Sequence, residues 1–194
     1  MAWSRHLASG VSRKDNAGVA SMVAPLIAAL ASAWVALLVA ASYLPVPLAG
    51  VLYVFGSVIC HQIADRSFHI DGAQLPVCAR CFGIYLGFCG ASLVRLATRA
   101  LPAFTAARLR QGRQGLRHSN ERMLLLAAAL PTALTIVLEW TGIHSSNLAR
   151  AMAGAPLGAV VGLIVMAAVQ APALHYEACA RTRPIESNPP PAPI

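Results

Sequence analysis

The chain has 194 residues, of which 57% are hydrophobic and only 11% are charged. Soluble domains are about 45–50% apolar and about 25% charged, so this composition excludes an ordinary soluble protein and predicts one embedded in a lipid bilayer. The formal net charge is +8, but the basic residues lie in short segments between apolar runs, which is typical of membrane topology. We therefore expect no nucleic-acid partner.

The first predicted element is a spanning helix over residues 22–44, preceded by a polar segment, residues 1–20. The run 22–44 contains no charged residue, and a spanning helix needs about 20 apolar residues. A cleaved secretory signal is the alternative, but the apolar core of such a signal is usually only about 7–15 residues long. We therefore predict that the helix is retained.

A shorter apolar stretch, Leu48–Ile59, follows Pro45 and Pro47, which end the first helix. Because this stretch is too short to cross a bilayer, it predicts an interfacial or re-entrant helix. The next segment, Ile63–Gln74, is predicted to be a polar loop.

Three further spanning helices are predicted, over Cys81–Leu101, Met123–Ile143 and Arg150–Leu174. The tail, residues 176–194, ends in a proline-rich run and is predicted to be disordered. The fold class is therefore all-α: a polytopic membrane bundle of four spanning helices and one short helix, with residues 21–175 as the membrane domain. Glycines four apart on the second and fourth spanning helices predict that these two helices meet closely.

The distribution of basic residues predicts the orientation. With a cytoplasmic N-terminus, twelve of the 15 basic residues lie on the cytoplasmic side, as the positive-inside rule requires. The other three are Arg66, Arg80 and Arg150. Both termini are then cytoplasmic in a multi-pass protein of the cytoplasmic membrane. The arginine-rich segment, residues 95–122, is predicted to contact anionic lipid head groups, and a homo-oligomer is left open.

Three of the five cysteines lie around the loop that faces outward: Cys60, Cys78 and Cys81. The spacing Cys78-x-x-Cys81 places two thiolates on one turn, and Cys60 and His61 supply further candidate ligands from across the loop. Sulfur together with imidazole is typical of a tetrahedral Zn²⁺ site. Because backbone strain disfavours two adjacent ligands on one ion, further candidates for the last ligand are His69, Asp65, His144 and water.

The same sulfur atoms permit two other interpretations. A CxxC pair at the start of a helix has a lowered thiol pKa, which suits thiol–disulfide exchange with Cys60 as a third thiol. A structural disulfide that holds the loop against the helix is the other alternative. Cys89 and Cys179 are predicted to be bystanders, because a buried cysteine is usually a small apolar filler.

Glu139 is a carboxylate inside a predicted span, which is costly and marks a candidate functional residue with a charged partner. Glu139 and Arg80 are the candidate catalytic residues if the protein is an enzyme, and a structural ion pair is the alternative. Arg66, Asn147 and Arg150 are predicted to line the same outer pocket. Serine or asparagine in the turn before the fourth helix can also simply cap that helix.

Several of these residues carry a family resemblance. The residues concerned are Cys60-His61-Gln62, Arg66-Ser67-Phe68, Leu75-Pro76-Val77-Cys78-Ala79-Arg80-Cys81 and Gly83-Ile84-Tyr85, followed by Ser146-Asn147, Arg150 and Gly154. They resemble the domain of unknown function family 2085, which comprises small prokaryotic membrane proteins. That family's third helix commonly carries an Asp-Gly pair, where this chain has Glu139-Trp140. The resemblance implies a membrane location and no particular activity.

Three functional hypotheses follow. The first is a metal-binding membrane protein, with zinc as the predicted ion and a lipid or envelope compound as substrate. The second is a membrane thiol–disulfide oxidoreductase. The third is a small transporter with Glu139 in its pathway, and it ranks last because nothing in the sequence resembles a long coupled ion path.

Overall fold

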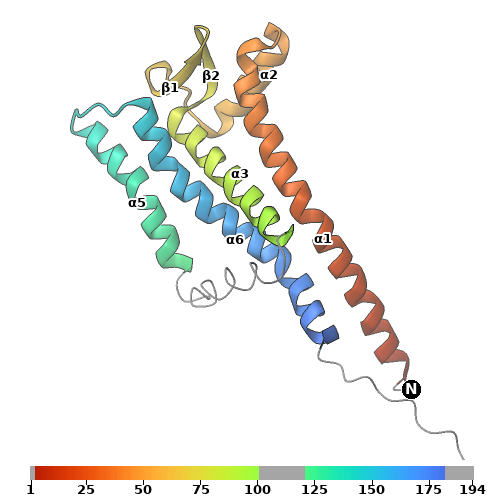
Figure 1. Cartoon of the computed structure of the whole chain (residues 1–194). Coiled ribbons are helices and arrows are strands. Elements are labelled where there is room, and N and C mark those ends of the chain that lie inside the picture. The colour runs from red at the N-terminus through yellow and green to blue at the C-terminus, as the bar shows by residue number, and fades with distance from the viewer. Residues whose placement is uncertain (1–2, 101–120, 182–194) are drawn as a thin grey trace, which may run out of the picture.

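The computed structural model describes residues 3–100 and 121–181 (Figure 1). Four of the described helices are long and apolar enough to cross a membrane. They are α1 (Trp3–Ala40), α3 (Ala79–Ala100), α5 (Glu121–Trp140) and α6 (Asn147–Arg181). The prediction of a membrane bundle with four spanning helices is therefore confirmed.

The helices differ from the predicted ones mainly at their outer ends. α1 begins at Trp3, although its apolar part begins only at Met22. α6 continues to Arg181 and so passes residue 176, where we expected the tail to begin. The rest of that tail and most of the arginine-rich segment lie outside the described residues.

A short apolar helix, α2 (Val46–Ile59), follows α1 after a 3₁₀ turn, as the sequence predicts. Pro45 is its N-cap and Pro47 lies in its first turn, a position where proline's missing N–H costs nothing. Most of its apolar side chains are exposed, and Val46 and Val58 are 86% and 80% exposed. Exposed apolar side chains at this density are typical of a helix in contact with lipid.

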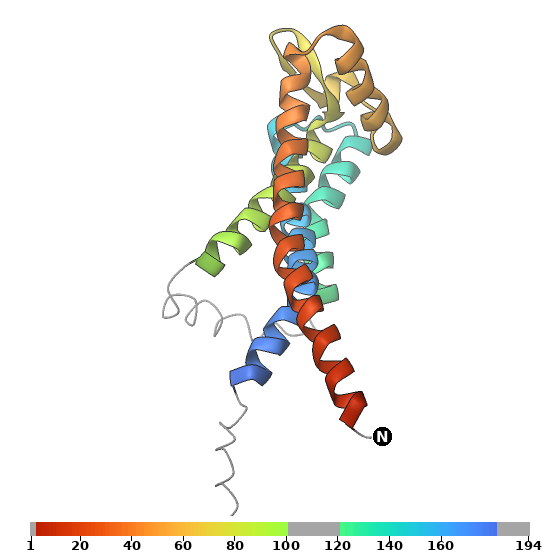
Figure 2. The same cartoon turned by 90° about the vertical axis from the view of Figure 1, so that its right-hand side faces the viewer.

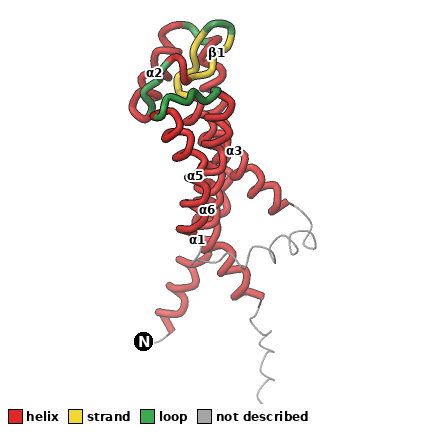
Figure 3. Tube along the Cα trace, turned by 90° about the vertical axis from the view of Figure 1, so that its left-hand side faces the viewer, coloured by secondary structure: helices red, strands yellow, loops and turns green. Residues whose placement is uncertain are grey.

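The segment predicted to be a polar loop instead folds into a 3₁₀ turn and a small antiparallel hairpin. Its strands are β1 (Ser67–Ile70) and β2 (Ala73–Cys78), at one end of the helices in Figure 3. The strands are joined by Asp71 and Gly72, whose φ angles are +51° and +82°. Two residues with positive φ form the type I′ turn that suits the twist of a hairpin. The loop prediction was therefore wrong, although the hairpin is a small addition to a helical fold.

α3 and α6 approach each other backbone to backbone, which confirms the prediction from the glycine spacing. A Cβ atom added to Gly158 would collide with the carbonyl oxygen of Ile84, and one added to Gly87 would collide with that of Ala155. Only glycine permits such a close approach at these positions. α1 packs against both helices and α5 packs against α6 (Figure 1), so α3 and α6 form the centre of the bundle.

A small buried cluster lies where α1 meets the hairpin. Leu38, Cys60 and Val77 form it, and partly buried aromatic side chains from α1 and α3 pack around it. Trp34 and Tyr85 meet edge to face with ring centroids 6.0 Å apart, a favourable aromatic geometry. In Figure 2, α2 and the hairpin lie together at the end of the bundle far from the N-terminus. The buried cluster thus attaches this end to the spanning helices.

Candidate metal centre

Three cysteine side chains converge at this end of the bundle. Cys60 directly follows α2, Cys78 ends β2 and Cys81 lies in the first turn of α3. Their three Sγ atoms all lie within 4.8 Å of one another, and each is a free thiol. Sulfur ligands about 2.3 Å from a tetrahedral ion are about 3.8 Å apart. The group is therefore close enough to hold a metal ion after small adjustments.

The Cys60 sulfur lies among backbone N–H groups. The N–H of Cys78 donates to it over 3.1 Å and the N–H of Gln62 over 3.5 Å. Cys60 is only 6% exposed, so water does little to stabilise charge there. N–H donors of this kind stabilise the negative charge of a metal-bound thiolate.

Cys78 lies outside the spanning segments and has a strongly lowered pKa. Hydrogen bonding with the Cys81 thiol, supported by the backbone N–H groups of Cys81 and Arg80 and by Cys60, lowers the pKa of Cys78 to about 5, although burial opposes this shift. The lowered pKa favours the thiolate form of Cys78. The thiolate is the form that binds metals and attacks disulfides.

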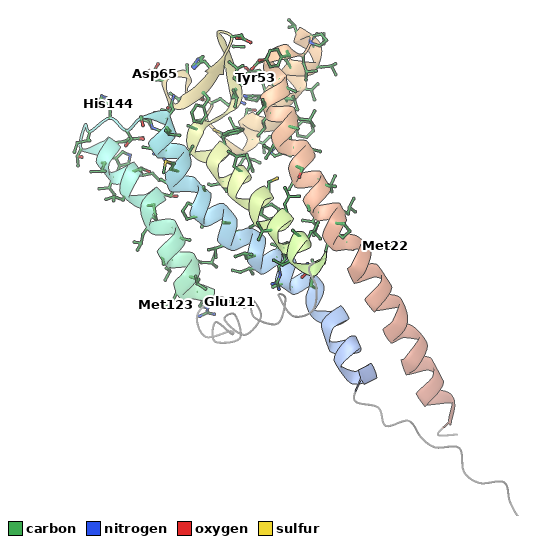
Figure 4. The ribbon with its side chains drawn as sticks, viewed as in Figure 1. Met22, Tyr53, Asp65, Glu121, Met123 and His144 are labelled. Carbon is green, nitrogen blue, oxygen red and sulfur yellow. The ribbon has the colours of Figure 1, made fainter. Side chains whose placement is uncertain are left out.

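None of the other predicted ligands joins the sulfur group. The side chains of these candidates are all exposed: His61, Asp65, His69 and His144. Figure 4 shows Asp65 and His144 at the same end of the molecule as Tyr53 of α2. The backbone at the first cysteine is extended, with φ −133° and ψ 136°, and successive side chains of an extended chain point in opposite directions. His61 nevertheless lines the same cavity as the three cysteines.

Gln62 holds the site together, although the sequence did not single it out beyond the family motif. Its Nε2 atom donates to the carbonyl oxygens of Tyr53, over 2.8 Å, and Pro76, over 2.6 Å. Its own carbonyl oxygen accepts a 2.7 Å hydrogen bond from Gln74 Nε2. These bonds join the end of α2 to β2 and so fix the first cysteine beside the second. The signal that marks Gln62 is its place directly after the Cys-His pair.

Beside the cysteines, one buried carboxylate binds three arginines. Glu139 Oε1 accepts from Arg150 Nε at 2.6 Å and from Arg80 Nη2 at 2.8 Å, and Oε2 pairs with Arg66 Nη1 at 3.2 Å. The Glu139 side chain is 3% exposed. The structure thus brings together both candidate catalytic residues and two of the predicted pocket residues, from the hairpin region, α3, α5 and α6.

Asn147 connects this network to the hairpin. Its Nδ2 atom donates to the carbonyl oxygen of Ser67 over 2.9 Å, and its Oδ1 atom accepts from Arg150 Nη1 over 2.7 Å. The capping role is taken by Ser146, whose Oγ atom accepts the backbone N–H three residues later at 3.2 Å. Asn147 therefore positions the arginines and the hairpin relative to each other.

A cavity of about 160 Å³ lies between the two groups of residues. All three cysteines line it, together with Arg66 and Arg80, which also bind Glu139. The cavity is therefore lined both by the candidate metal ligands and by two of the arginines that bind Glu139.

Four apolar helices and a thiol cluster at one end define a polytopic membrane protein with a candidate metal centre. Residues 60–164, more than half of the chain, match the family described as "Predicted membrane protein (DUF2085)". The chain belongs to this family. The matched region begins at Cys60 and contains the cysteine cluster and the arginine–glutamate network.

The relatives that match are uncharacterized archaeal proteins. The chain is 33% identical to one from Methanothermobacter thermautotrophicus over 113 residues, which is 57% of this chain and 86% of that relative. It is 61% identical to one from Methanocaldococcus jannaschii over 36 residues, which is 19% of this chain and 23% of that relative. No solved structure matches this chain.

Proposed function

We propose that this protein binds zinc through Cys60, Cys78 and Cys81 at the outer face of the cytoplasmic membrane. The observation that carries the proposal is the set of three sulfur atoms within 4.8 Å of one another. Thiolate ligands favour a soft or borderline ion, and Zn²⁺ accepts such a set in tetrahedral geometry. The fourth position is left for His61, water or a substrate atom, and an open fourth position is typical of catalytic zinc.

The orientation in this proposal rests on charge and on shape. The cysteines lie at the ends of α2 and β2 and at the start of α3. In Figure 1, α2 and the hairpin lie at one end of the bundle, and the N-terminus and the end of α6 lie at the other. The positive-inside rule places the arginine-rich side, and with it both termini, in the cytoplasm, where the arginines meet anionic lipid head groups. The metal site then faces outward, with the exposed apolar side chains of α2 in the lipid interface beside it.

Elemental analysis of protein purified in detergent without chelators tests the proposal. We expect one zinc ion per chain, and we expect Cys78→Ser and Cys60→Ser to lose it. Cys89→Ser is the matched control, because Cys89 is also buried but contacts Ser32 in the packing of α1 on α3. Wild-type protein that holds no metal, even after incubation with zinc, would refute the proposal.

Thiol–disulfide exchange is the second candidate, and the lowered pKa of Cys78 favours it. A Cys78 thiolate could attack a partner's disulfide, and Cys81 would then complete a Cys78–Cys81 disulfide while the partner leaves as two thiols. In that case purified protein holds no metal, a mild disulfide oxidant removes two thiols, and Cys81→Ser traps a mixed disulfide. Retention of zinc with all thiols protected excludes this function.

A further inference from the structure

The arginine network has more positive charge than its carboxylate can balance. Among the described residues, Glu139 is the one carboxylate in ion-pair contact with Arg66, Arg80 and Arg150. The side chains of Arg80 and Arg150 are only 16% and 7% exposed. Buried charges without sufficient partners are costly, so this group favours an additional anion.

Hydrogen-bonding capacity is also left over beside the cavity. The Nε atom of Arg80 is buried and has no acceptor among the described residues. The Arg66 side chain is 43% exposed, and one of its Nη atoms pairs with Glu139. Both arginines line the cavity that contains the three sulfur atoms. Two arginines of the network and the candidate metal ligands therefore line one cavity.

The charges remain unbalanced when metal is included. A Zn²⁺ ion bound by three thiolates carries a formal charge of −1, whereas three arginines with one carboxylate carry +2. One positive charge is left, which matches a monoanion. The planar fork of arginine donors suits phosphate oxygens.

We propose that the cavity binds a phosphate group, with one oxygen at the fourth position of the metal and other oxygens accepting from Arg66 and Arg80. This proposal rests on the proposed metal site and names its substrate class. The phosphate comes either from a lipid head group or from a free phosphate compound. A volume of about 160 Å³ holds such a group, and the chains of a lipid would stay in the bilayer beside α2.

Cobalt-substituted protein in dodecyl maltoside micelles, which contain no phosphate, provides the test, because Co²⁺ absorption bands report changes among the ligands. Added inorganic phosphate is expected to shift the bands in a saturable way. Arg66→Gln should weaken this affinity at least about tenfold, because the variant removes a charge-assisted hydrogen-bond donor. Arg122→Gln removes an exposed arginine near the start of α5 and should leave the affinity unchanged.

Arg66→Gln suits this test because Glu139 keeps both of its less exposed partners in the variant. An unfolding midpoint close to the wild-type value shows that the variant is folded. Micelles to which phosphatidylglycerol is added, without inorganic phosphate, distinguish the two sources. Bands shifted by the lipid alone assign the phosphate to a head group, and bands shifted only by inorganic phosphate assign it to a free compound.

Bands that respond to neither source, in protein that binds Co²⁺, overturn the phosphate proposal and leave the metal site intact. Protein that binds no Co²⁺ refutes the metal site instead. In that case a calorimetric titration of the metal-free protein with inorganic phosphate decides the role of the arginines. Binding that Arg66→Gln weakens keeps the phosphate site, and an absence of binding overturns it.

Discussion

Replacing Glu139 with glutamine tests the charge network most directly. Glutamine has nearly the same shape and still accepts hydrogen bonds through one oxygen, so packing changes little. The variant removes the negative charge that lies 2.6–3.2 Å from three guanidinium groups. The effect on stability is therefore mainly electrostatic.

The size of the effect follows from burial. Arg150 and Glu139 are 7% and 3% exposed, and removing one partner of a buried pair costs about 3–5 kcal/mol. Arg66 is 43% exposed, and an exposed pair contributes only about 0–1 kcal/mol. Because the three pairs share one carboxylate, their contributions do not add. We expect Glu139→Gln to lose about 3–5 kcal/mol and Arg66→Gln about 0–1 kcal/mol.

Unfolding in mixed detergent micelles, followed by circular dichroism as the fraction of SDS rises, measures both losses. The matched control is Glu121→Gln, because Glu121 lies at the other end of the same helix and is exposed (Figure 4). Exposed substitutions of this kind change stability by about 0.5 kcal/mol or less. Equal losses in Glu139→Gln and Glu121→Gln would refute the assignment of a stabilising network to Glu139.

Three further substitutions test the helix packing, the hairpin turn and the hydrogen bonds of Gln62. Gly158→Leu should separate α3 from α6 and lower stability by at least about 1–3 kcal/mol in the same unfolding assay. The control Gly90→Leu should have little effect, because a Cβ atom at Gly90 has no neighbour within 4 Å. Equal effects of the two variants would contradict the close packing. Gly72→Val places a β-branched residue at φ +82°, which should lower the stability of the hairpin by about 1–2 kcal/mol. The variant should therefore be cut faster in limited proteolysis of the hairpin, and an unchanged cleavage rate argues against the turn. Gln62→Ala leaves two carbonyl groups without their donor and should accelerate zinc release to a chelator, an outcome that identical release rates would exclude.

The spanning helices were predictable because their signal is local. Each span is a long run without charge, and the glycine spacing that joins α3 to α6 repeats with the helical period. The hairpin was missed because its strands are only four and six residues long and include polar side chains. Its clearest signal is Asp71-Gly72, a dipeptide typical of two-residue hairpin turns.

The candidate site was less predictable because its parts come from distant segments. The CxxC spacing predicts that Cys78 and Cys81 lie together, but the position of Cys60 beside them depends on contacts with β2, including the hydrogen bonds of Gln62 and the Cys78 N–H. The sequence likewise suggests that Glu139 has a basic partner. Its contact with Arg66 depends on how the hairpin docks onto α6, which no spacing in the sequence reveals.

The docking of the hairpin also implies an order of assembly during synthesis. All three cysteines have been synthesised once Cys81 has been added, whereas Asn147, which binds the carbonyl oxygen of Ser67, follows Cys81 by 66 positions. At about 5–20 residues per second, this separation lasts roughly 3–13 s. The cysteines of the proposed metal site are thus available before Glu139, the carboxylate that binds Arg66, has been added. The last two crossings then complete the arginine network beside cysteines that were already in place.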